Sequence, residues 1–209
     1  MKLVKTKDGS YTVFNEAASE HYHTISGAIE EAFEKHVNAL GINNGMQILD
    51  FCFGIGYNSI AACKDHANLQ ITALENDKKI IEAMKDIEIP EILIKEFAHF
   101  RNIAESMDVT DNRNNRIQIF LGNALQIIDE LSDSKFNRVF FDPFSPKKQP
   151  EMWSEEIFQK IYNKMKIGAK LSTYSCAKQI RKNMISVGFK VMDGPVVGRR
   201  SPATIAVKE

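Results

Sequence analysis

From residue 46 onward, short apolar runs alternate with segments of helical spacing, and this alternation constrains the fold more than any other feature. The apolar runs predict strands near 46–51, 70–75, 117–121, 137–142, 169–175 and 203–208. The segments between them predict helices near 57–66, 77–85, 123–131, 154–165 and 177–187. Strands and helices that alternate in this way form a mainly parallel sheet with helices on both faces. The sequence therefore predicts an α/β fold.

The first part of the chain has a different pattern. Residues 1–15 alternate apolar and polar around Asp8-Gly9, which is a strong turn signal and predicts a hairpin. Residues 24–40 have helical spacing. We therefore expect a small hairpin and helix extension over residues 1–45, followed by the main domain over residues 46–209.

One connection in the main domain is longer than a normal loop. It covers residues 86–116, and within it Glu91 to Met107 has helical spacing while Asp108 to Arg116 is polar and rich in asparagine. We expect an inserted helical segment followed by a loop.

The formal net charge of zero hides a strong asymmetry. Residues 157–208 contain eleven Lys or Arg against one acid, Asp193, so this stretch carries +10 and the remainder carries −10. A segregated basic region can bind a polyanion even when the whole chain is neutral. An ordinary solvated basic face is the alternative that the composition leaves open.

Several classes of protein are disfavoured. No apolar run approaches the roughly 18 residues of a membrane span, and the first ten residues lack the apolar core of a signal peptide. The three cysteines lack metal spacing, and His21 and His23 have no apparent further ligands. We expect a reduced, cytoplasmic protein without a metal and without a membrane partner.

The first strand of the main domain leads into a glycine turn. Asp50 lies four residues before Gly54, and Gly56 precedes the expected helix. The two glycines let the backbone bend sharply and approach a ligand closely. The third glycine of a dinucleotide fingerprint is replaced by Ser59, and the turn has no basic phosphate cradle.

The next strand ends carry further polar groups. Glu75 ends the second strand, where a carboxylate can accept hydrogen bonds from both hydroxyls of a ribose. Asn123 follows the third strand and suits the edge of an adenine ring, because its amide both donates and accepts. Asp142 ends the fourth strand, before a proline-rich loop that carries Phe144 and Trp153. These strand ends predict a nucleoside site beside a reaction site.

This order of polar strand ends resembles the class I S-adenosylmethionine-dependent methyltransferases, which have a Rossmann-like sheet. The resemblance implies that Asp50 and the Gly54–Gly56 turn lie beside the methionine portion of S-adenosylmethionine, Glu75 beside its ribose and Asn123 beside its adenine. The residues expected to contact the cofactor are Asp50, Phe53, Gly54, Gly56, Asn58, Glu75, Asn123 and Ala124, with Tyr22 and Glu30 closing over it.

Longer segments resemble one family, the tRNA 5-methylaminomethyl-2-thiouridine methyltransferases. The matching segments, in the family's order, are Asp8–Thr12, Glu20–Glu30, Asp50–Asn58, Phe141–Trp153 and Val197–Arg200. The resemblance implies methyl transfer to the amine of 5-aminomethyluridine, with or without a 2-thio group, at the wobble position of tRNA. No flavin oxidase domain accompanies the segments, which is typical of the stand-alone form. Cys52 stands where the family usually has glycine.

The resemblance also assigns the acceptor side. Asp142 is expected to hold and orient the neutral amine, since an ordinary carboxylate is a weak base for an amine of pKa about 10. Phe144 or Trp153 is expected to stack on the flipped base. The residues expected to meet phosphates near the tRNA anticodon are Lys147, Lys148, Arg199 and Arg200.

Three other functions remain open. An aminopropyltransferase of the spermidine-synthase type shares the sheet, although the basic C-terminal third argues against its polycationic substrates. A methyltransferase for a small-molecule or protein amine is the second. The third is a non-catalytic RNA-binding protein with a degenerate cofactor loop, a reading that Cys52 supports. The oligomeric state is left open.

Overall fold

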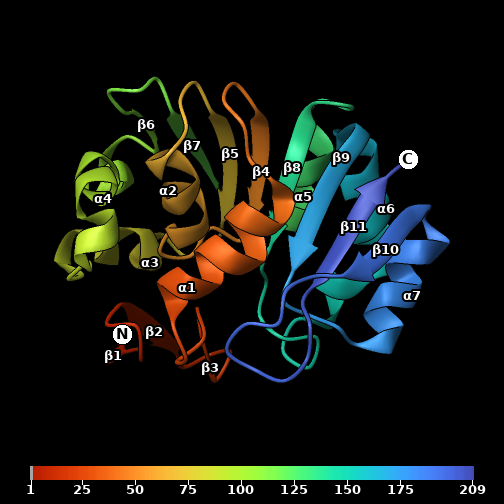
Figure 1. Cartoon of the computed structure of the whole chain (residues 1–209), viewed down its shortest axis with the longest axis horizontal. Helices are drawn as coiled ribbons and strands as arrows, with labels where there is room; N and C mark the ends of the chain where they lie inside the picture. Colours follow the sequence, from red (N-terminus) through yellow and green to blue (C-terminus); the bar gives the residue numbers. More distant parts are fainter. Residues whose placement is uncertain (1) are drawn as a thin grey trace.

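The main element of the structure is an eight-stranded sheet of order β10-β11-β9-β8-β4-β5-β7-β6 (Figure 1). The structure is a computed structural model that describes residues 2–209. The parallel strands are β4 (Gln47–Phe51), β5 (Gln70–Glu75), β7 (Arg116–Leu121), β8 (Phe136–Phe141) and β9 (Met165–Thr173). The antiparallel strands are β6 (Asp108–Thr110), β10 (Phe189–Asp193) and β11 (Thr204–Lys208). The predicted, mainly parallel α/β sheet is confirmed.

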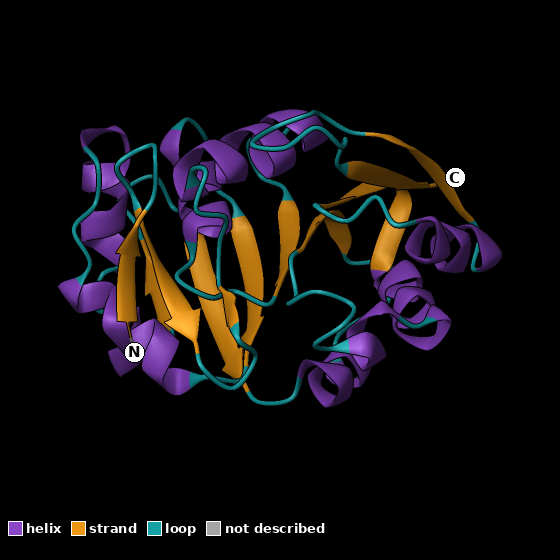
Figure 2. Cartoon of the chain, turned by 90° about the horizontal axis from the view of Figure 1, so that it is seen from below, coloured by secondary structure: helices purple, strands orange, loops and turns teal. Residues whose placement is uncertain are grey.

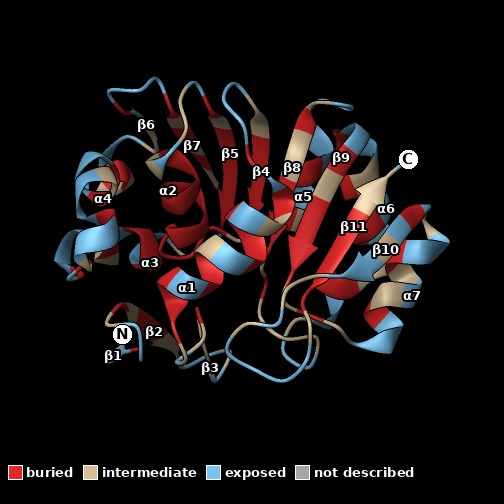
Figure 3. Cartoon of the chain, viewed as in Figure 1, coloured by how far each residue is buried: buried red, intermediate tan, exposed pale blue. Residues whose placement is uncertain are grey.

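Helices cover both faces of this sheet, as predicted (Figures 1 and 2). One hydrophobic cluster lies under α1 (Ala28–Glu31), η1 (Ala32–Asn38), α2 (Tyr57–Lys64), α3 (Lys78–Ala83) and α4 (Ile94–Phe100). The second lies under α5 (Ala124–Glu130), η5 (Pro150–Trp153), α6 (Glu155–Lys164) and α7 (Lys178–Ser186). Figure 3 shows the sheet buried between these layers. Within residues 2–209, no helix has the length and apolar character needed to cross a membrane.

The connection over residues 86–116 is partly as predicted. Short helical turns η2 (Met84–Asp86), η3 (Glu91–Leu93) and η4 (Ile103–Glu105) flank α4, so this stretch contains helix, while its status as an insertion stays a prediction. The expected loop from Asp108 is wrong in its first part, because β6 adds to the edge of the sheet through β7. An ion pair between Asp108 and Arg116 holds the two strands together.

The N-terminal residues form a separate three-stranded sheet of β1 (Lys2–Lys5), β2 (Tyr11–Asn15) and β3 (Glu20–His21). The predicted hairpin is confirmed. The carboxylate of Asp8, in its turn, accepts hydrogen bonds from the amides of Ile29 and Glu30 and so caps α1. The division of the chain at residues 45 and 46 stays a prediction.

The glycine turn after β4 has a strained and crowded backbone. Gly56 has φ +82°, and a Cβ placed there would overlap the ring of Phe53. Cys52 has φ +75°, so it keeps the left-handed conformation that glycine favours even though it carries a side chain. Gly45 also has a positive φ, +76°, but nothing lies within 4 Å of its would-be Cβ.

Replacement of Gly56 by alanine should destabilise the fold by about 3 kcal/mol, because it adds overlap with Phe53 to the cost of a left-handed alanine. Gly45→Ala is the matched control and should cost only about 1 kcal/mol, since its surroundings are open. Urea unfolding followed by circular dichroism measures both. Equal losses would show that crowding by Phe53 is unimportant.

Candidate active site

The strand register brings the predicted polar groups to one edge of the sheet. Phe51 pairs with Leu74 on one side and with Phe141 on the other, so Glu75 and Asp142 follow directly on both sides of β4. A cavity of about 460 Å³ lies at this edge. The predicted site residues that line it are Tyr22, Gly54, Glu75, Ala124, Asp142, Phe144 and Arg199.

Glu75 is buried at the end of β5 and is fixed by backbone amides. Its Oε2 accepts a hydrogen bond from Gly54 N at 2.8 Å, and its Oε1 accepts from Asn76 N and Asp77 N. Burial raises the pKa of this carboxyl, and the three backbone bonds partly offset the effect. A carboxylate offers about four acceptor positions, so Glu75 keeps capacity for a ligand donor in the cavity.

Asp50 lies behind the cavity rather than in its wall. Its Oδ2 accepts a hydrogen bond from Ser59 Oγ at 2.5 Å, while its Oδ1 is buried without a partner among residues 2–209. Burial raises its pKa well above the usual value. Phe53 and Gly56 also lie outside the cavity wall, with the Phe53 ring packed against Gly56.

Two predicted cofactor contacts do not reach the cavity. Asn123 is exposed, and its side chain accepts a hydrogen bond from Leu125 N as the cap of α5, so the expected adenine contact stays a prediction. Glu30 is exposed and faces a second, shallow hollow beside Phe33. The residue after it, Glu31, lines the cavity instead.

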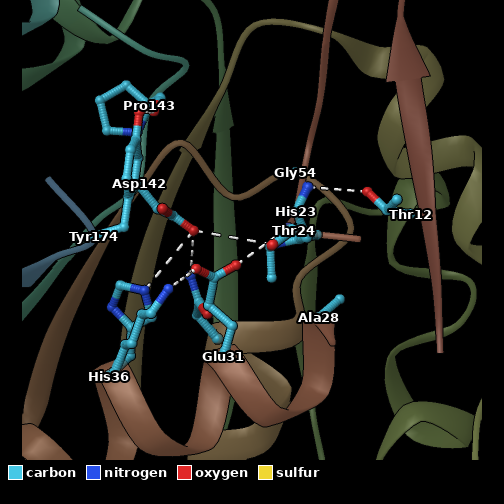
Figure 4. Close-up of polar contacts among 12 residues, drawn as sticks. Thr12, His23, Thr24, Ala28, Glu31, His36, Gly54, Asp142, Pro143 and Tyr174 are labelled. Carbon is cyan, nitrogen blue, oxygen red and sulfur yellow. Dashed lines mark hydrogen bonds and ion pairs between the residues drawn. The ribbon is translucent and has the colours of Figure 1, made fainter. Parts of the chain in front are cut away.

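Asp142 is the centre of a buried polar cluster (Figure 4). Its Oδ2 accepts a hydrogen bond from Asn58 Nδ2 at 3.3 Å. His23 Nδ1 lies 4.0 Å from the same oxygen, and His36 Nε2 lies 3.8 Å from it. Burial, reinforced by the nearby charge of Glu31, raises the pKa of Asp142 to about 6.

The two histidines of this cluster are neutral. Burial lowers the pKa of His23, and it lowers the pKa of His36 to about 4. His36 Nδ1 bonds to Ser172 Oγ at 2.8 Å, whereas its Nε2 is among the buried atoms without a partner in residues 2–209. Both rings therefore meet Asp142 as uncharged polar groups.

An ion pair lies next to the histidines. Lys35 Nζ contacts Glu31 Oε1, and Glu31 Oε2 accepts a hydrogen bond from Thr24 N at 3.2 Å. Burial acts to raise the pKa of Glu31, but the ammonium of Lys35 outweighs it and the pKa is lowered. The pair adds no net charge to the cavity.

Most residues of this cluster were not recognised from the sequence as functional. It includes His23, Glu31, Lys35, His36 and Tyr174, of which all but His36 line the cavity. Three of them lie on α1 and η1, where a π-helical segment turns successive polar residues inward. Polar residues at positions 31, 35 and 36, inside an otherwise apolar helical stripe, were the available signal.

The loop after Asp142 closes the acceptor side. Glu20 of β3 accepts hydrogen bonds from Ser145 N, at 2.9 Å, and from Ser145 Oγ. The Phe144 ring lies 5.0 Å from the Tyr22 ring. Trp153 is buried, and its Nε1 donates to Phe144 O, so the expectation that Trp153 stacks on a base is corrected to a role in the core.

The basic groups are distributed less simply than the sequence indicates. Arg199 lines the cavity with its guanidinium 5.7 Å from the Tyr174 ring. Arg200, Lys147 and Lys148 are exposed and lie outside the cavity wall. Four other cations of the C-terminal third are paired with acids, namely Lys160, Lys164, Arg181 and Lys190. The +10 charge of this stretch is therefore partly neutralised.

The cavity is suited to cationic ligands. Among residues 2–209, Glu75, Asp50 and Asp142 have no Lys or Arg ion-pair partner, and burial raises the pKa of all three. A sulfonium or an ammonium group would supply the missing positive charge. These carboxylates fit S-adenosylmethionine, whose sulfonium is positively charged. In the same residues, no group of three or more His, Cys, Asp or Glu is arranged to hold a metal ion.

Comparisons with known proteins agree with this geometry. Residues 86–209 match the family described as S-adenosyl-L-methionine-dependent methyltransferase. An uncharacterized protein of Methanocaldococcus jannaschii is 32% identical over 99% of this chain and 59% of its own length. The tRNA 5-methylaminomethyl-2-thiouridine biosynthesis bifunctional protein MnmC of Leptospira interrogans is 26% identical over 93% of this chain. The chain spans only 33% of that MnmC protein.

Solved structures give the same relationship. The crystal structure of MnmC2 from Aquifex aeolicus matches 99% of this chain and 70% of its own, with a TM-score of 0.83 and 27% identity. Spermidine synthase from Thermotoga maritima matches 100% of this chain and 72% of its own, with a TM-score of 0.64. At 16% identity, this second likeness shows the fold alone. The chain belongs to the S-adenosyl-L-methionine-dependent methyltransferases, as an MnmC-like member of that family.

Proposed function

We propose that the chain transfers a methyl group from S-adenosylmethionine to the amine of 5-aminomethyluridine, with or without a 2-thio group, at the wobble position of tRNA. The product is the 5-methylaminomethyl nucleoside. The likeness to the MnmC proteins supports the substrate, although the chain spans only a third of the bifunctional relative from Leptospira interrogans.

The observation that carries the proposal is the set of buried carboxylates without Lys or Arg partners, Asp50, Glu75 and Asp142. Burial alone would disfavour their ionised forms, which is why the pKa of each is raised. Both proposed ligands bring positive charge, as the sulfonium of S-adenosylmethionine and as the substrate ammonium. Their binding would stabilise the ionised carboxylates.

Asp142 is the proposed amine-binding residue. With a pKa of about 6, it is mostly ionised at pH 7 and accepts an N–H bond from the substrate. An alkyl amine has a pKa of about 10.4, so the carboxylate remains a weak base for it. We therefore assign Asp142 to orienting the neutral amine, with most of the rate gain coming from alignment.

The remaining cavity wall suits a flipped nucleotide. Phe144 is half-buried beside Tyr22 and offers a stacking surface for the uracil ring. Arg199 at the cavity and the exposed Arg200, Lys147 and Lys148 are proposed to meet phosphates of the anticodon stem-loop.

The direct test is incubation with labelled S-adenosylmethionine and tRNA that carries 5-aminomethyl-2-thiouridine, followed by nucleoside analysis. Labelled 5-methylaminomethyl-2-thiouridine is expected. Parallel reactions with putrescine and decarboxylated S-adenosylmethionine test for an aminopropyltransferase. Product in the second reaction alone would replace the proposed function, and failure to bind S-adenosylmethionine in calorimetry would favour a non-catalytic protein.

Asp142→Asn should abolish methyl transfer, with a loss of about 100-fold or more, and yet stabilise the folded protein at pH 8. A raised pKa means that ionisation of Asp142 disfavours the folded state. The contribution of Asp142 to the free energy of unfolding therefore falls as pH rises from about 4 to about 6. The variant removes this cost, and the free energy of unfolding should rise by about 1–3 kcal/mol.

The stability difference should disappear at pH 4, where Asp142 is protonated in wild type, and this pH dependence is the internal control. Urea unfolding at both pH values measures it. A variant that is less stable at pH 8 would contradict the raised pKa, and full activity would remove Asp142 from the reaction.

Glu75→Gln should weaken S-adenosylmethionine binding by about tenfold or more. Three backbone amides leave the Glu75 carboxylate about one acceptor position for a ribose hydroxyl, and replacing one oxygen by NH2 removes acceptor capacity. Glutamine keeps the size of the side chain but loses at least one of the three backbone N–H bonds at the turn, so circular dichroism is used to check that the variant is folded. Glu82→Gln on α3 is the matched control, since that carboxylate is exposed. Isothermal calorimetry gives both dissociation constants. Equal constants for wild type and Glu75→Gln would exclude the ribose role.

Arg199→Ala combined with Arg200→Ala should weaken tRNA binding and lower the slope of log affinity against log salt by roughly 1–2. Lys166→Ala combined with Lys190→Ala is the control, because Lys166 lies near the amino end of β9 and Lys190 lies at the amino end of the edge strand β10. Filter binding at several salt concentrations measures both pairs. Equal effects would indicate a diffuse basic surface.

A further inference from the structure

His23 is a buried polar side chain with no partner of its own. Its side chain is 4% exposed, and neither ring nitrogen has a hydrogen-bond partner among residues 2–209. The residue lines the cavity, and its backbone N–H donates to Thr12 Oγ1. Buried polar atoms nearly always have a hydrogen-bond partner, so these nitrogens indicate that a bound ligand supplies one.

The two ring nitrogens face different parts of the site. Nδ1 lies 4.0 Å from Asp142 Oδ2, which is too long for a direct hydrogen bond. Nε2 lies on the side of the glycine turn, 3.6 Å from the would-be Cβ of Gly54. His23 thus stands between the turn that holds the cofactor and the carboxylate that holds the amine.

The gap between His23 and Asp142 matches one shared donor. For an amine nitrogen about 2.9 Å from both His23 Nδ1 and Asp142 Oδ2, the angle between the two hydrogen-bond directions is roughly 90°, close to the angle between two N–H bonds. One neutral primary amine can therefore donate to both atoms at once. Its lone pair is then left free on the remaining side.

The surroundings keep His23 an acceptor. Burial lowers its pKa, which outweighs the opposite effect of Asp142, so the ring is neutral and one nitrogen carries a lone pair. The other charged or titratable groups around it are Glu31, which is paired with Lys35, the neutral His36, and Tyr57, whose ring lies 5.2 Å from the His23 ring. A hydrogen on Nε2 leaves Nδ1 as the acceptor that faces Asp142.

We propose that His23 is the second acceptor for the substrate amine, and that the pair of His23 and Asp142 limits the reaction to one methyl group. This inference rests on the proposed function, because it concerns the same amine. His23 is then a specificity-determining residue, while Asp142 remains the main amine-binding group.

With Asp142 and His23 as acceptors, every proton and electron pair of the methyl transfer can be followed. The substrate ammonium first loses one proton to water. The neutral amine then donates one N–H to Asp142 Oδ2 and the other to His23 Nδ1, and its lone pair forms the new N–C bond to the methyl carbon. The electron pair of the breaking C–S bond passes to sulfur, which becomes the neutral thioether of S-adenosylhomocysteine. The nitrogen is left as a secondary ammonium, which the Asp142 carboxylate stabilises and which exchanges its proton with water after the product leaves.

A second transfer is disfavoured by the same geometry. The secondary amine has one N–H, so with its lone pair aimed at a new methyl donor it can satisfy only one acceptor. The other acceptor would face the methyl group and stay buried without a partner, which should slow a second transfer by more than about tenfold.

The decisive variant is His23→Phe, which keeps the ring shape and removes both nitrogens. With tRNA carrying 5-aminomethyl-2-thiouridine, wild type should yield only the monomethyl nucleoside by mass spectrometry. The variant should yield the dimethylamino nucleoside as well, with its fraction raised at least about tenfold. His23→Asn keeps an acceptor near the Nδ1 position and should remain restricted to monomethyl product.

His36→Phe is the matched control, because His36 lies 3.8 Å from the same Asp142 oxygen but outside the cavity wall. It should give no dimethyl product, whatever its rate. Dimethyl product from His36→Phe or His23→Asn at the level of His23→Phe would overturn the inference, as would monomethyl product alone from a folded His23→Phe.

A test without variants covers the case in which His23→Phe does not fold. Wild type is given tRNA that already carries 5-methylaminomethyl-2-thiouridine, which should bind in filter assays but accept no methyl group. Dimethylation there overturns the inference. If wild type methylates neither tRNA, both the proposed function and the inference fail. If wild type and His23→Phe both methylate the aminomethyl tRNA and both stop at one methyl group, the inference alone is overturned.

Discussion

The site depends on one constraint, the parallel pairing of β4 between β5 and β8. Since Phe51 is level with Leu74 and Phe141, the carboxylates that follow these partners lie on both sides of the turn after β4. A shift of one residue in either pairing would turn the side chains to opposite faces of the sheet. The helices on the two faces bury β4 completely enough to exclude such a shift, so packing far from the cavity sets the distances inside it.

The same packing makes the site electrostatically costly. Removal of Asp50, Glu75 and Asp142 from water without cationic side chains nearby disfavours their charged forms, and the protein offsets this only partly with backbone amides and Ser59. The arrangement favours cationic ligands over neutral or anionic ones. It also separates the two kinds of charge. The basic side chains Arg199 and Arg200 lie toward the exposed surface, while the acids lie inside.

The sheet and the strand-end acids were predictable because they follow local patterns. Apolar runs in the sequence predicted β4, β5, β7, β8 and β9. Glu75 and Asp142 were identified because they are polar residues at the ends of such runs. The edge strand β10 was missed, since Lys190 and Asp193 interrupt its apolar residues and Met192 is exposed. Glu31 and His36 were not assigned from the sequence, although polar residues inside an apolar helical stripe were a signal, because the spacing alone does not show that they face Asp142. Trp153 was misread for the converse reason, as an aromatic in a loop gives no sign of whether it packs inward.

The bond between Glu20 and Ser145 has a consequence for how the molecule is assembled. The two residues are 125 positions apart, and His36 bonds to Ser172 across 136 positions. A ribosome therefore makes the N-terminal wall of the cavity long before the strands that it must dock against. Contacts between residues that are distant in sequence slow the folding of a chain, because the long loop between them must be closed. An incomplete chain that ends before β8 lacks both Asp142 and Ser145 and cannot form this wall of the cavity.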